Sequence, residues 1–188
     1  MLTIGIIIGS TRPGRRGETV ARWVYEAAKK RNDATYELID IKDFNLPLLD
    51  EPRPPSMGGY VHEHTKAWSA KIDPLDGFVF VTPEYNYGPS AALKNAIDFL
   101  YAEWNNKAAG FVSYGSTLGV RAVVQLREIM AEIQVADVRG HVSLSLLTDF
   151  ENYQIFKPAA GHEPRLTHMF DQLVAWSTAL KPLRAKPA

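Results

Sequence analysis

The feature that most constrains the fold is a regular alternation of β-rich and helical segments along the chain. The β-rich runs are Thr3–Ile8, Thr35–Ile41, Gly77–Thr82, Ala109–Tyr114 and His141–Leu146. The first, third and fourth runs are almost continuously apolar, which is typical of strands buried on both faces of a parallel sheet. The second run alternates more strongly and is typical of a strand nearer an edge.

Helical segments separate these runs. We expect helices at Glu18–Arg31, Val61–Ile72, Ser90–Tyr101, Ala122–Ile133 and Leu166–Leu180. In the last two, apolar residues recur at steps of three and four, which places them on one face of an amphipathic helix. Parallel strands joined by crossovers of this length form a right-handed α/β sheet.

The length of the chain suits a single domain. We expect residues 1–181 of the 188 to form it and residues 182–188 to be a disordered tail. Two irregular segments, Pro47–Gly59 and Asp149–Pro164, interrupt the pattern. Loops of this length inside a domain usually border a site or an interface.

Composition excludes several classes of function. The 21 Lys and Arg residues balance 21 Asp and Glu residues, so the cationic excess of a nucleic-acid or membrane-surface binder is missing. There is no Cys, which excludes disulfides, thiolate nucleophiles and iron–sulfur clusters. Redox chemistry would therefore need a bound cofactor. The apolar run at the N-terminus is too short to span a bilayer and lacks a basic flank, so we expect a cytoplasmic protein.

The first β-rich run leads directly into the loop Gly9–Gly17, whose sequence is GSTRPGRRG. A loop between a parallel strand and a helix N-terminus presents free N–H groups and the positive end of the helix dipole. Hydroxyl groups and guanidinium groups add further donors here; they belong to Ser10, Thr11, Thr19, Arg12, Arg15 and Arg16. The loop matches neither the Walker A pattern nor G-x-G-x-x-G. These residues predict a site for a phosphate monoester, and the alternative is a solvated basic turn.

A stiff loop, Thr82–Pro89, follows the third run and reads TPEYNYGP. Its prolines fix the backbone, whereas Asn86 and Gly88 permit turn conformations that other residues resist. Such a loop can direct backbone polar groups at the edge of a planar ring, with Tyr85 or Tyr87 against it. The alternative is an ordinary connection whose tyrosines pack on the core.

A third loop, Gly115–Gly119, follows the fourth run, and its glycines permit close approach of a ligand to the backbone. For a strand order of 2-1-3-4-5, the order reverses between the first and third strands. Ligands bind beyond the carboxyl ends of the strands at such a point. The three loops are therefore expected to converge on one crevice.

These segments resemble the NAD(P)H-dependent FMN reductase family of flavodoxin-like proteins, which includes azoreductases, quinone reductases and chromate reductases. The matching motifs are Gly9–Arg12, the PEYNY segment Pro83–Tyr87, Leu93–Asp98 and Gly115–Ser116. They occur in the family's order and spacing between Thr3 and about Ile133, and the PEYNY segment is the most specific. The resemblance implies an α/β three-layer sandwich with a five-stranded parallel sheet of order 2-1-3-4-5 and helices on both faces.

The resemblance also implies the cofactor and its contacts. The FMN phosphate would be held by Ser10, Arg12, Gly17 and Thr19, and the isoalloxazine ring would be lined by Pro83, Glu84, Tyr85, Asn86, Tyr87, Gly115 and Ser116. Thr11 and Arg16 are also expected to bind the cofactor, and Arg15 and Arg16 are open alternatives as phosphate ligand, nicotinamide-nucleotide ligand or solvent-facing charge. No catalytic side chain is expected, because the chemistry takes place at flavin N5. Either Arg15 or Arg16 could read the 2′-phosphate of NADPH, which leads to the hypothesis of a preference for NADPH over NADH.

The expected activity is electron transfer from NADPH or NADH through FMN to a small acceptor by ping-pong kinetics. Quinones, azo compounds, metal oxyanions and free flavin are all compatible acceptors. The alternative is a flavodoxin-type electron carrier, which the neutral charge and the arginine-rich first loop disfavour. The resemblance implies a homodimer or homotetramer.

The histidines do not predict a metal site. His62 and His64 are two residues apart on an expected helix, so they would point about 200° apart and could not share one ion. His141, His162 and His168 have no evident carboxylate partner and are interpreted as structural or exposed residues.

Overall fold

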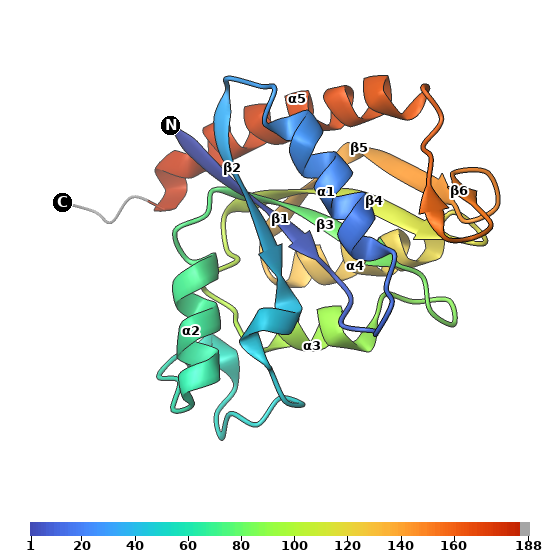
Figure 1. Cartoon of the computed structure of the whole chain (residues 1–188). Helices are drawn as coiled ribbons and strands as arrows, with labels where there is room; N and C mark the ends of the chain where they lie inside the picture. Colours follow the sequence, from blue (N-terminus) through green and yellow to red (C-terminus); the bar gives the residue numbers. More distant parts are fainter. Residues whose placement is uncertain (185–188) are drawn as a thin grey trace.

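Five parallel strands form the central sheet of the computed structural model, which describes residues 1–184 (Figure 1). The strands are β1 (Leu2–Ile8), β2 (Ala34–Asp40), β3 (Gly77–Pro83), β4 (Lys107–Gly115) and β5 (Val135–Ser145). Their order is β2-β1-β3-β4-β5, and each pairs with its neighbours in parallel. The predicted sheet order is confirmed.

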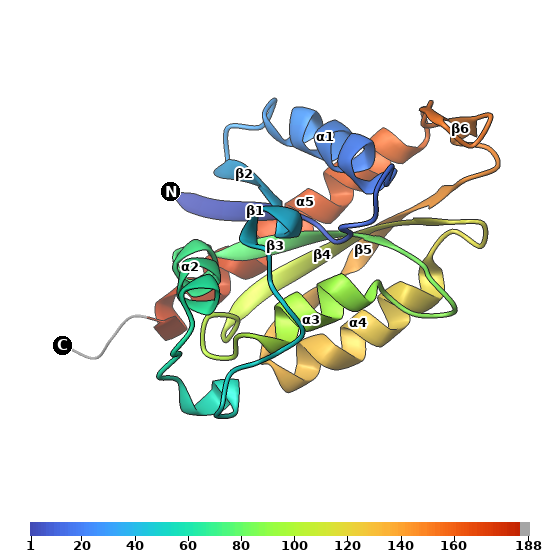
Figure 2. The same ribbon diagram turned by 60° about the horizontal axis from the view of Figure 1, so that its bottom comes forward.

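Helices cover both faces of the sheet (Figure 2). The helices are α1 (Gly17–Ala28), α2 (Glu63–Ile72), α3 (Ala91–Asp98), α4 (Val120–Glu132) and α5 (His162–Leu180), with short 3-10 helices η1 (Ile41–Phe44), η2 (Pro55–Met57) and η3 (Lys181–Arg184). Helices α1 and α5 pack on one face, and α2, α3 and α4 lie on the other. The predicted three-layer sandwich is therefore confirmed.

Two hydrophobic cores lie on the two faces because successive side chains of a strand point to opposite sides. In β3, Val79 and Val81 belong to the core beneath α1 and α5. Phe78 and Phe80 alternate with them and pack around the fully buried Trp104 in the other core. A strand that contributes to both cores needs apolar residues at every position, which explains the continuous apolar runs in the sequence.

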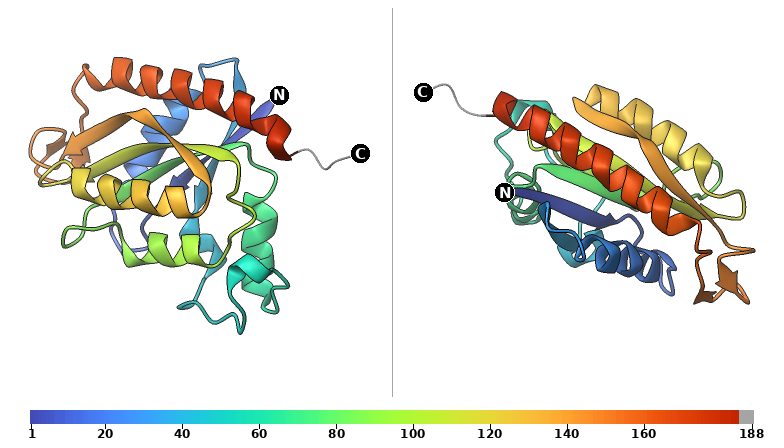
Figure 3. Two further views of the ribbon diagram at one scale, coloured as in Figure 1. Left: turned by 180° about the vertical axis from the view of Figure 1, so that it is seen from behind. Right: turned by 90° about the horizontal axis from the view of Figure 1, so that it is seen from above.

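The structure extends the least regular parts of the expected pattern. Strand β5 begins at Val135 rather than at His141, and its pairing with β4 shifts register between Ala109 and Phe111. The segment expected to be irregular between 149 and 164 contains a small hairpin of β6 (Phe150–Glu151) and β7 (Ile155–Phe156), visible beside the start of α5 (Figure 3). As an edge strand with a polar outward row, β5 lacks the apolar continuity that identified the others.

The predicted disorder from residue 182 is wrong as far as Arg184. Residues Lys181–Arg184 form η3, and the side chains of Lys181 and Arg184 both pair with the buried carboxylate of Asp76. Residues 185–188 of the expected tail lie outside the described residues. Separately, no helix within residues 1–184 is both long enough and apolar enough to cross a bilayer.

One charged side chain lies inside the fold at the start of β4. The Lys107 side chain is 1 % exposed, and its Nζ donates to the carbonyl oxygens of Ile72 (3.0 Å) and Asp73 (2.8 Å). Burial lowers the pKa of Lys107 to about 8. In the unfolded chain this lysine is protonated at any pH below its ordinary pKa of 10.5. Between these values the unfolded state binds more protons, so the free energy of unfolding rises with pH.

We predict that Lys107→Met removes this pH-dependent part of the stability, roughly 3 kcal/mol between pH 8 and 10.5. Urea unfolding of the wild type and the variant at several pH values measures it. Other groups titrate alike in both proteins, so the difference isolates Lys107. The exposed Lys29→Met is the matched control and keeps the wild-type dependence. Identical curves for Lys107→Met and the wild type would contradict the assignment.

Candidate functional site

The loops that follow β1, β3 and β4 meet at the carboxyl edge of the sheet, as the topology predicts. They enclose a hollow of about 310 Å³, at the lower end of the range for small-molecule pockets. Its lining consists of Arg12, Gly14, Arg15, Arg16, Pro83, Glu84, Tyr85, Tyr114, Gly115, Ser116, Leu146 and Tyr153. We refer to this hollow as the strand-tip pocket.

Hydrogen bonds fix the first loop against β3 and α3. Gly9 N donates to Val81 O (2.8 Å), and Ser90 Oγ donates to Gly9 O (2.5 Å). The same Ser90 hydroxyl caps α3 by accepting from Leu93 N (3.1 Å). Ser10 is buried, and its Oγ lies 3.2 Å from the Tyr85 hydroxyl, which joins the first and third loops. The first and third loops, which were predicted to converge, are therefore in direct contact.

The three arginines of the first loop have different roles. Arg15 is only 8 % exposed, pairs with Asp40 at the end of β2, and donates to Ser10 O (2.6 Å). Arg16 donates to the carbonyl oxygens of Tyr153 (2.8 Å) and Gly14 (3.3 Å). Within residues 1–184, neither Arg12 nor Arg16 pairs with a carboxylate. Arg15 therefore stabilises the conformation of the first loop. The positive charges of Arg12 and Arg16, in contrast, lie beside the pocket and are not balanced by a carboxylate of the described residues.

The N-terminus of α1 adds donors to these charges. The helix begins at Gly17, and no side chain caps its first turn. A Cβ at Gly17 would lie 2.6 Å from the Tyr114 hydroxyl, so glycine is required for this approach. The Tyr114 hydroxyl is buried and has no hydrogen-bond partner in the described part of the chain. Burial also raises the pKa of Tyr114, which keeps the hydroxyl a donor.

These features match the needs of a phosphate group. A phosphate monoester requires several donors and positive charge, and the free N–H groups of a helix start supply both. Arg12 and Arg16 contribute cations, and the unpaired Tyr114 hydroxyl offers one more donor. The residues present at the strand-tip pocket therefore fit the anionic end of a nucleotide cofactor.

The third loop is a tight turn with an unusual backbone. Tyr85 N donates to Gly88 O (2.9 Å), and Gly88 N donates to Tyr85 O (3.0 Å). The two residues between them, Asn86 and Tyr87, have φ values of 47° and 78°, as in a type I′ turn. A tyrosine resists this conformation. It is held by the Arg121 guanidinium 4.5 Å from the Tyr87 ring centroid, and by Gln125 Nε2, which donates to Tyr87 O (2.8 Å).

Glu84 joins the third loop to the fourth. Its carboxylate is 4 % exposed and accepts from Thr117 Oγ1 (3.1 Å), Arg121 N (3.1 Å) and Arg121 Nε (2.5 Å). Burial opposes ionisation, but the hydrogen bonds from Arg121 and Thr117 outweigh it and lower the pKa of Glu84. Its backbone N donates to Tyr114 O (3.1 Å). Glu84 therefore lines the pocket, and its side chain holds the third and fourth loops together.

The structure brings most, but not all, of the predicted residues to the pocket. The lining includes Arg12, Arg16, Pro83, Glu84, Tyr85, Gly115 and Ser116, with Ser10 and Gly17 directly behind it. Thr11 instead lines a neighbouring hollow beside Asn95. Thr19 is exposed on α1, and Asn86 and Tyr87 form the exposed tip of the turn. These four residues do not line the pocket.

Four lining residues were not predicted, namely Gly14, Tyr114, Leu146 and Tyr153. Tyr114 ends an apolar strand, and its sequence signal is that of a core residue. Tyr153 belongs to the segment between 149 and 164 that was expected to border a site, so its loop was found although the residue was not. Leu146 is brought to the pocket by its backbone N, which donates to Gly115 O (3.1 Å).

The geometric argument about His62 and His64 is wrong. Helix α2 begins at Glu63, so His62 is extended and the two rings stack with centroids 5.2 Å apart. Both rings face Asp50, whose Oδ1 lies 3.0 Å from His64 Nε2. Among residues 1–184, no group of three or more His, Cys, Asp and Glu side chains is arranged to hold a metal ion.

Comparisons with known proteins agree with the geometry. The family model described as NADPH-dependent FMN reductase matches residues 2–149. An NAD(P)H-dependent FMN reductase of Schizosaccharomyces pombe is 39% identical over 185 residues, covering 94% of this chain and 92% of the relative. A quinone reductase of Escherichia coli is 31% identical over 137 residues, covering 69% of each protein.

The fold also matches solved structures. The flavoenzyme NAD(P)H:(acceptor) oxidoreductase FerB of Paracoccus denitrificans superposes with a TM-score of 0.73 and 17% identity. The match covers 95% of this chain and 98% of that protein. An archaeal flavodoxin superposes with a TM-score of 0.58, 12% identity, and coverage of 96% and 99%. These likenesses establish a flavodoxin-like fold.

We predict that Glu84→Gln lowers the free energy of unfolding at pH 7 by about 1–3 kcal/mol, because Arg121 loses a buried charged acceptor. The native carboxylate has a lowered pKa, so its contribution is lost as pH falls below the ordinary value of 4.5. The two proteins should therefore converge in acid. Denaturant unfolding at pH 7 and below pH 4 measures this, with the exposed Glu63→Gln as the matched control. A constant difference at all pH values would contradict the role of the charge.

Proposed function

This chain belongs to the NADPH-dependent FMN reductase family and is an oxidoreductase that uses FMN and NAD(P)H. We propose that it transfers electrons from the nicotinamide nucleotide to a small acceptor molecule by a ping-pong mechanism. The proposed acceptors are quinones, azo compounds, metal oxyanions or free flavin. Relatives named quinone reductase, including the one from Escherichia coli, favour a quinone.

The observation that carries the proposal is the combination, around the first loop and among residues 1–184, of two arginines without a carboxylate partner, an uncapped helix N-terminus and an unpaired hydroxyl. In this proposal, Arg12, Arg16 and the first turn of α1 hold the FMN phosphate. The Tyr114 hydroxyl, which has no partner among residues 1–184, donates to the same ligand. Ser10 positions the loop through its contact with Tyr85. Arg15 supports this arrangement from behind through Asp40 and adds no contact of its own.

The isoalloxazine ring would lie between the third and fourth loops. Tyr85, Pro83, Gly115 and Ser116 line that part of the pocket. The bracing of Glu84 by Arg121 and Thr117 keeps the two loops at a fixed separation, which reduces the entropy lost when a planar ring is bound. When bound, FMN would supply the two-electron redox chemistry. The protein supplies position and access.

A flavodoxin-type carrier is the alternative function. A carrier would receive electrons from a protein partner and would not oxidise NADPH or NADH itself. The equal numbers of acidic and basic residues and the uncompensated arginines at the pocket favour a small anionic donor over a basic protein surface. Membership of a reductase family favours the enzyme as well.

We predict that anaerobic addition of NADPH or NADH to the FMN-loaded protein bleaches the flavin within the time of a turnover. In steady state, initial rates at several quinone concentrations should give parallel double-reciprocal lines, because donor and acceptor use one pocket in turn. Stopped-flow absorbance and initial-rate assays measure the two effects.

Each result has a distinct contrary outcome. Flavin that stays oxidised with both nucleotides but is reduced by dithionite would support the carrier. Intersecting lines with bleaching intact would overturn only the ping-pong order. A colourless protein that takes up no added FMN would overturn the whole proposal.

We predict that Arg12→Ala weakens FMN binding by about tenfold or more, since a charge-assisted contact with phosphate is lost. Ser10→Ala, which removes the contact with Tyr85, should add to this loss. Fluorescence titration of the apoprotein with FMN and with riboflavin measures the effect, and the riboflavin affinity should change little. Arg53→Ala, in the loop between 47 and 59, is the matched control for charge. Undiminished FMN affinity in the Ser10/Arg12 double variant would refute the phosphate site.

We further propose assembly into a homodimer or homotetramer. Large apolar side chains exposed on α4 and α5 support this proposal. Among them, Val124 is 57% exposed and Trp176 is 50% exposed. Such exposed apolar side chains are typical of interaction surfaces. Light scattering at several protein concentrations would measure the assembly.

A further inference from the structure

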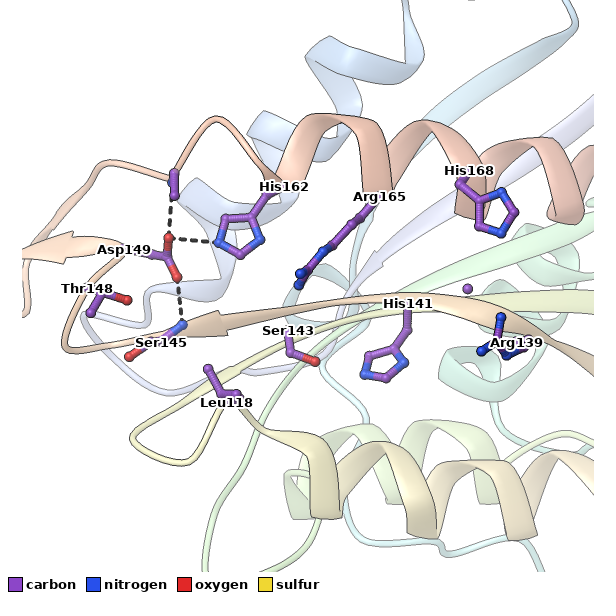
Figure 4. A pocket seen from close by; sticks show the side chains of 12 residues that line it. Leu118, Arg139, His141, Ser143, Ser145, Thr148, Asp149, His162, Arg165 and His168 are labelled. Atoms are coloured by element: carbon purple, nitrogen blue, oxygen red, sulfur yellow. Dashed lines mark hydrogen bonds and ion pairs between the residues drawn. The ribbon is translucent and has the colours of Figure 1, made fainter.

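A second hollow, of about 710 Å³, lies between β5 and the first half of α5 (Figure 4). Polar side chains of β5 and of α5 line it. Arg139, His141 and Ser143 alternate along β5 and share the side of the strand away from α5, because Val138 and Val142, at the alternate positions, belong to the core beneath α5. His162, Arg165 and His168 occur at three-residue steps on α5, which places them on one helix face above that strand. We call this hollow the basic groove.

The groove has an excess of positive charge. Within residues 1–184, neither Arg139 nor Arg165 pairs with a carboxylate. The only carboxylate in the lining is that of Asp149, which is 3% exposed. It is fully engaged, because it accepts from Ser145 N (2.8 Å) and Ala159 N (3.0 Å) and lies 2.9 Å from His162 Nε2. The two guanidinium charges therefore remain uncompensated.

His162 contradicts the expectation that it lacks a carboxylate partner, and it carries a further feature. Its second ring nitrogen, Nδ1, is buried and has no hydrogen-bond partner among the described residues. Leaving a buried polar atom unpaired costs stability, so such an atom indicates a partner that is bound in function. Burial and the positive charges of Arg127 and Arg165 also lower the pKa of His141, in agreement with an electropositive groove.

The basic groove adjoins the strand-tip pocket. Ser116 lines the pocket and Leu118, two residues later in the same loop, lines the groove. Likewise, Leu146 lines the pocket and Ser145 lines the groove. The hydrogen bond from Leu146 N to Gly115 O joins these two segments into a shared wall. An extended ligand with one end above the pocket can therefore reach the groove.

We infer that the basic groove binds the phosphate groups of the nicotinamide nucleotide, with Arg139 and Arg165 as the residues that recognise them. The inference rests on the proposed function, in which Arg12 and Arg16 are engaged by the FMN phosphate. Arg15, one of the two residues expected to read a 2′-phosphate, is paired with Asp40. The donor's phosphates therefore need other cations, and Arg139 and Arg165 are the unpaired ones in the adjoining hollow.

This assignment has a consequence for specificity. NADPH carries a 2′-phosphate that NADH lacks, and two guanidinium groups with a buried imidazole favour the ligand with more phosphate charge. The groove therefore gives NADPH its advantage over NADH. The site of discrimination lies on β5 and α5 and is separate from the first loop.

Binding of adenosine 2′,5′-bisphosphate to the FMN-loaded protein tests the inference directly, without redox turnover. Calorimetric titration should show tighter binding than for AMP, and the Arg139→Ala/Arg165→Ala double variant should lose about tenfold or more in affinity. The same variant should raise KM for NADPH more than KM for NADH, which shares the pyrophosphate but lacks the 2′-phosphate, while FMN affinity changes little. Arg22→Ala/Lys29→Ala, which removes one exposed charge from α1 and one from the residue after its C-terminus, is the matched control and should bind as the wild type does.

The contrary outcomes are separable. Equal affinity of the double variant and the wild type for adenosine 2′,5′-bisphosphate would overturn the inference while flavin bleaching by NADPH leaves the proposed function intact. Inorganic pyrophosphate binding as tightly as the bisphosphate, with the same loss in the variant, would make the groove a general anion site and also overturn it. Failure of NADPH to bleach the wild type would instead remove the proposed function.

Discussion

Burial of both faces of the parallel sheet is the constraint on which the rest of the structure depends. Helices must cover each face, so successive crossovers leave β1 and β3 as neighbours while their following helices, α1 and α3, go to opposite sides. The loops after these strands diverge from one another and leave an opening at the carboxyl edge. The strand-tip pocket is thus a consequence of chain topology before any side chain is considered.

The distribution of charge then decides what this edge can bind. The chain has no net charge, but its arginines are not distributed evenly. Within residues 1–184, some form ion pairs with carboxylates, and others do not. The Arg15–Asp40 pair is largely buried, and the buried carboxylate of Glu84 pairs with the partly exposed Arg121; both pairs hold backbone loops in place. Arg12 and Arg16 project from the braced first loop without a carboxylate in the described residues. The Arg15–Asp40 ion pair fixes the first loop, and the loop presents the unbalanced charges of Arg12 and Arg16 to the pocket. Such an arrangement preorganises an anion site.

The same division extends to β5 and α5. Asp149 binds two backbone N–H groups and His162, and so orders the segment that leads into α5. Arg139 and Arg165, by contrast, face the groove without such partners. Because the end of β5 and the fourth loop form a common wall, the pocket and the groove make one continuous surface with cations at both ends. In the proposed function, this continuity would relate the FMN site to the recognition of the electron donor.

The sequence by itself determined the five strands of the sheet, most of the helices and the three loops of the pocket, because periodicity and loop chemistry are local properties, whereas the sheet order came from the family resemblance. It also identified Ser10, Arg12 and Tyr85. It could not separate Arg15 from Arg16, since only the tertiary structure brings Asp40 to Arg15 and Tyr153 to Arg16. Tyr114 and the pair of Asp149 with His162 were hidden for the same reason. Their roles depend on which partners distant segments supply, and that is fixed only when the sheet and its helices pack together.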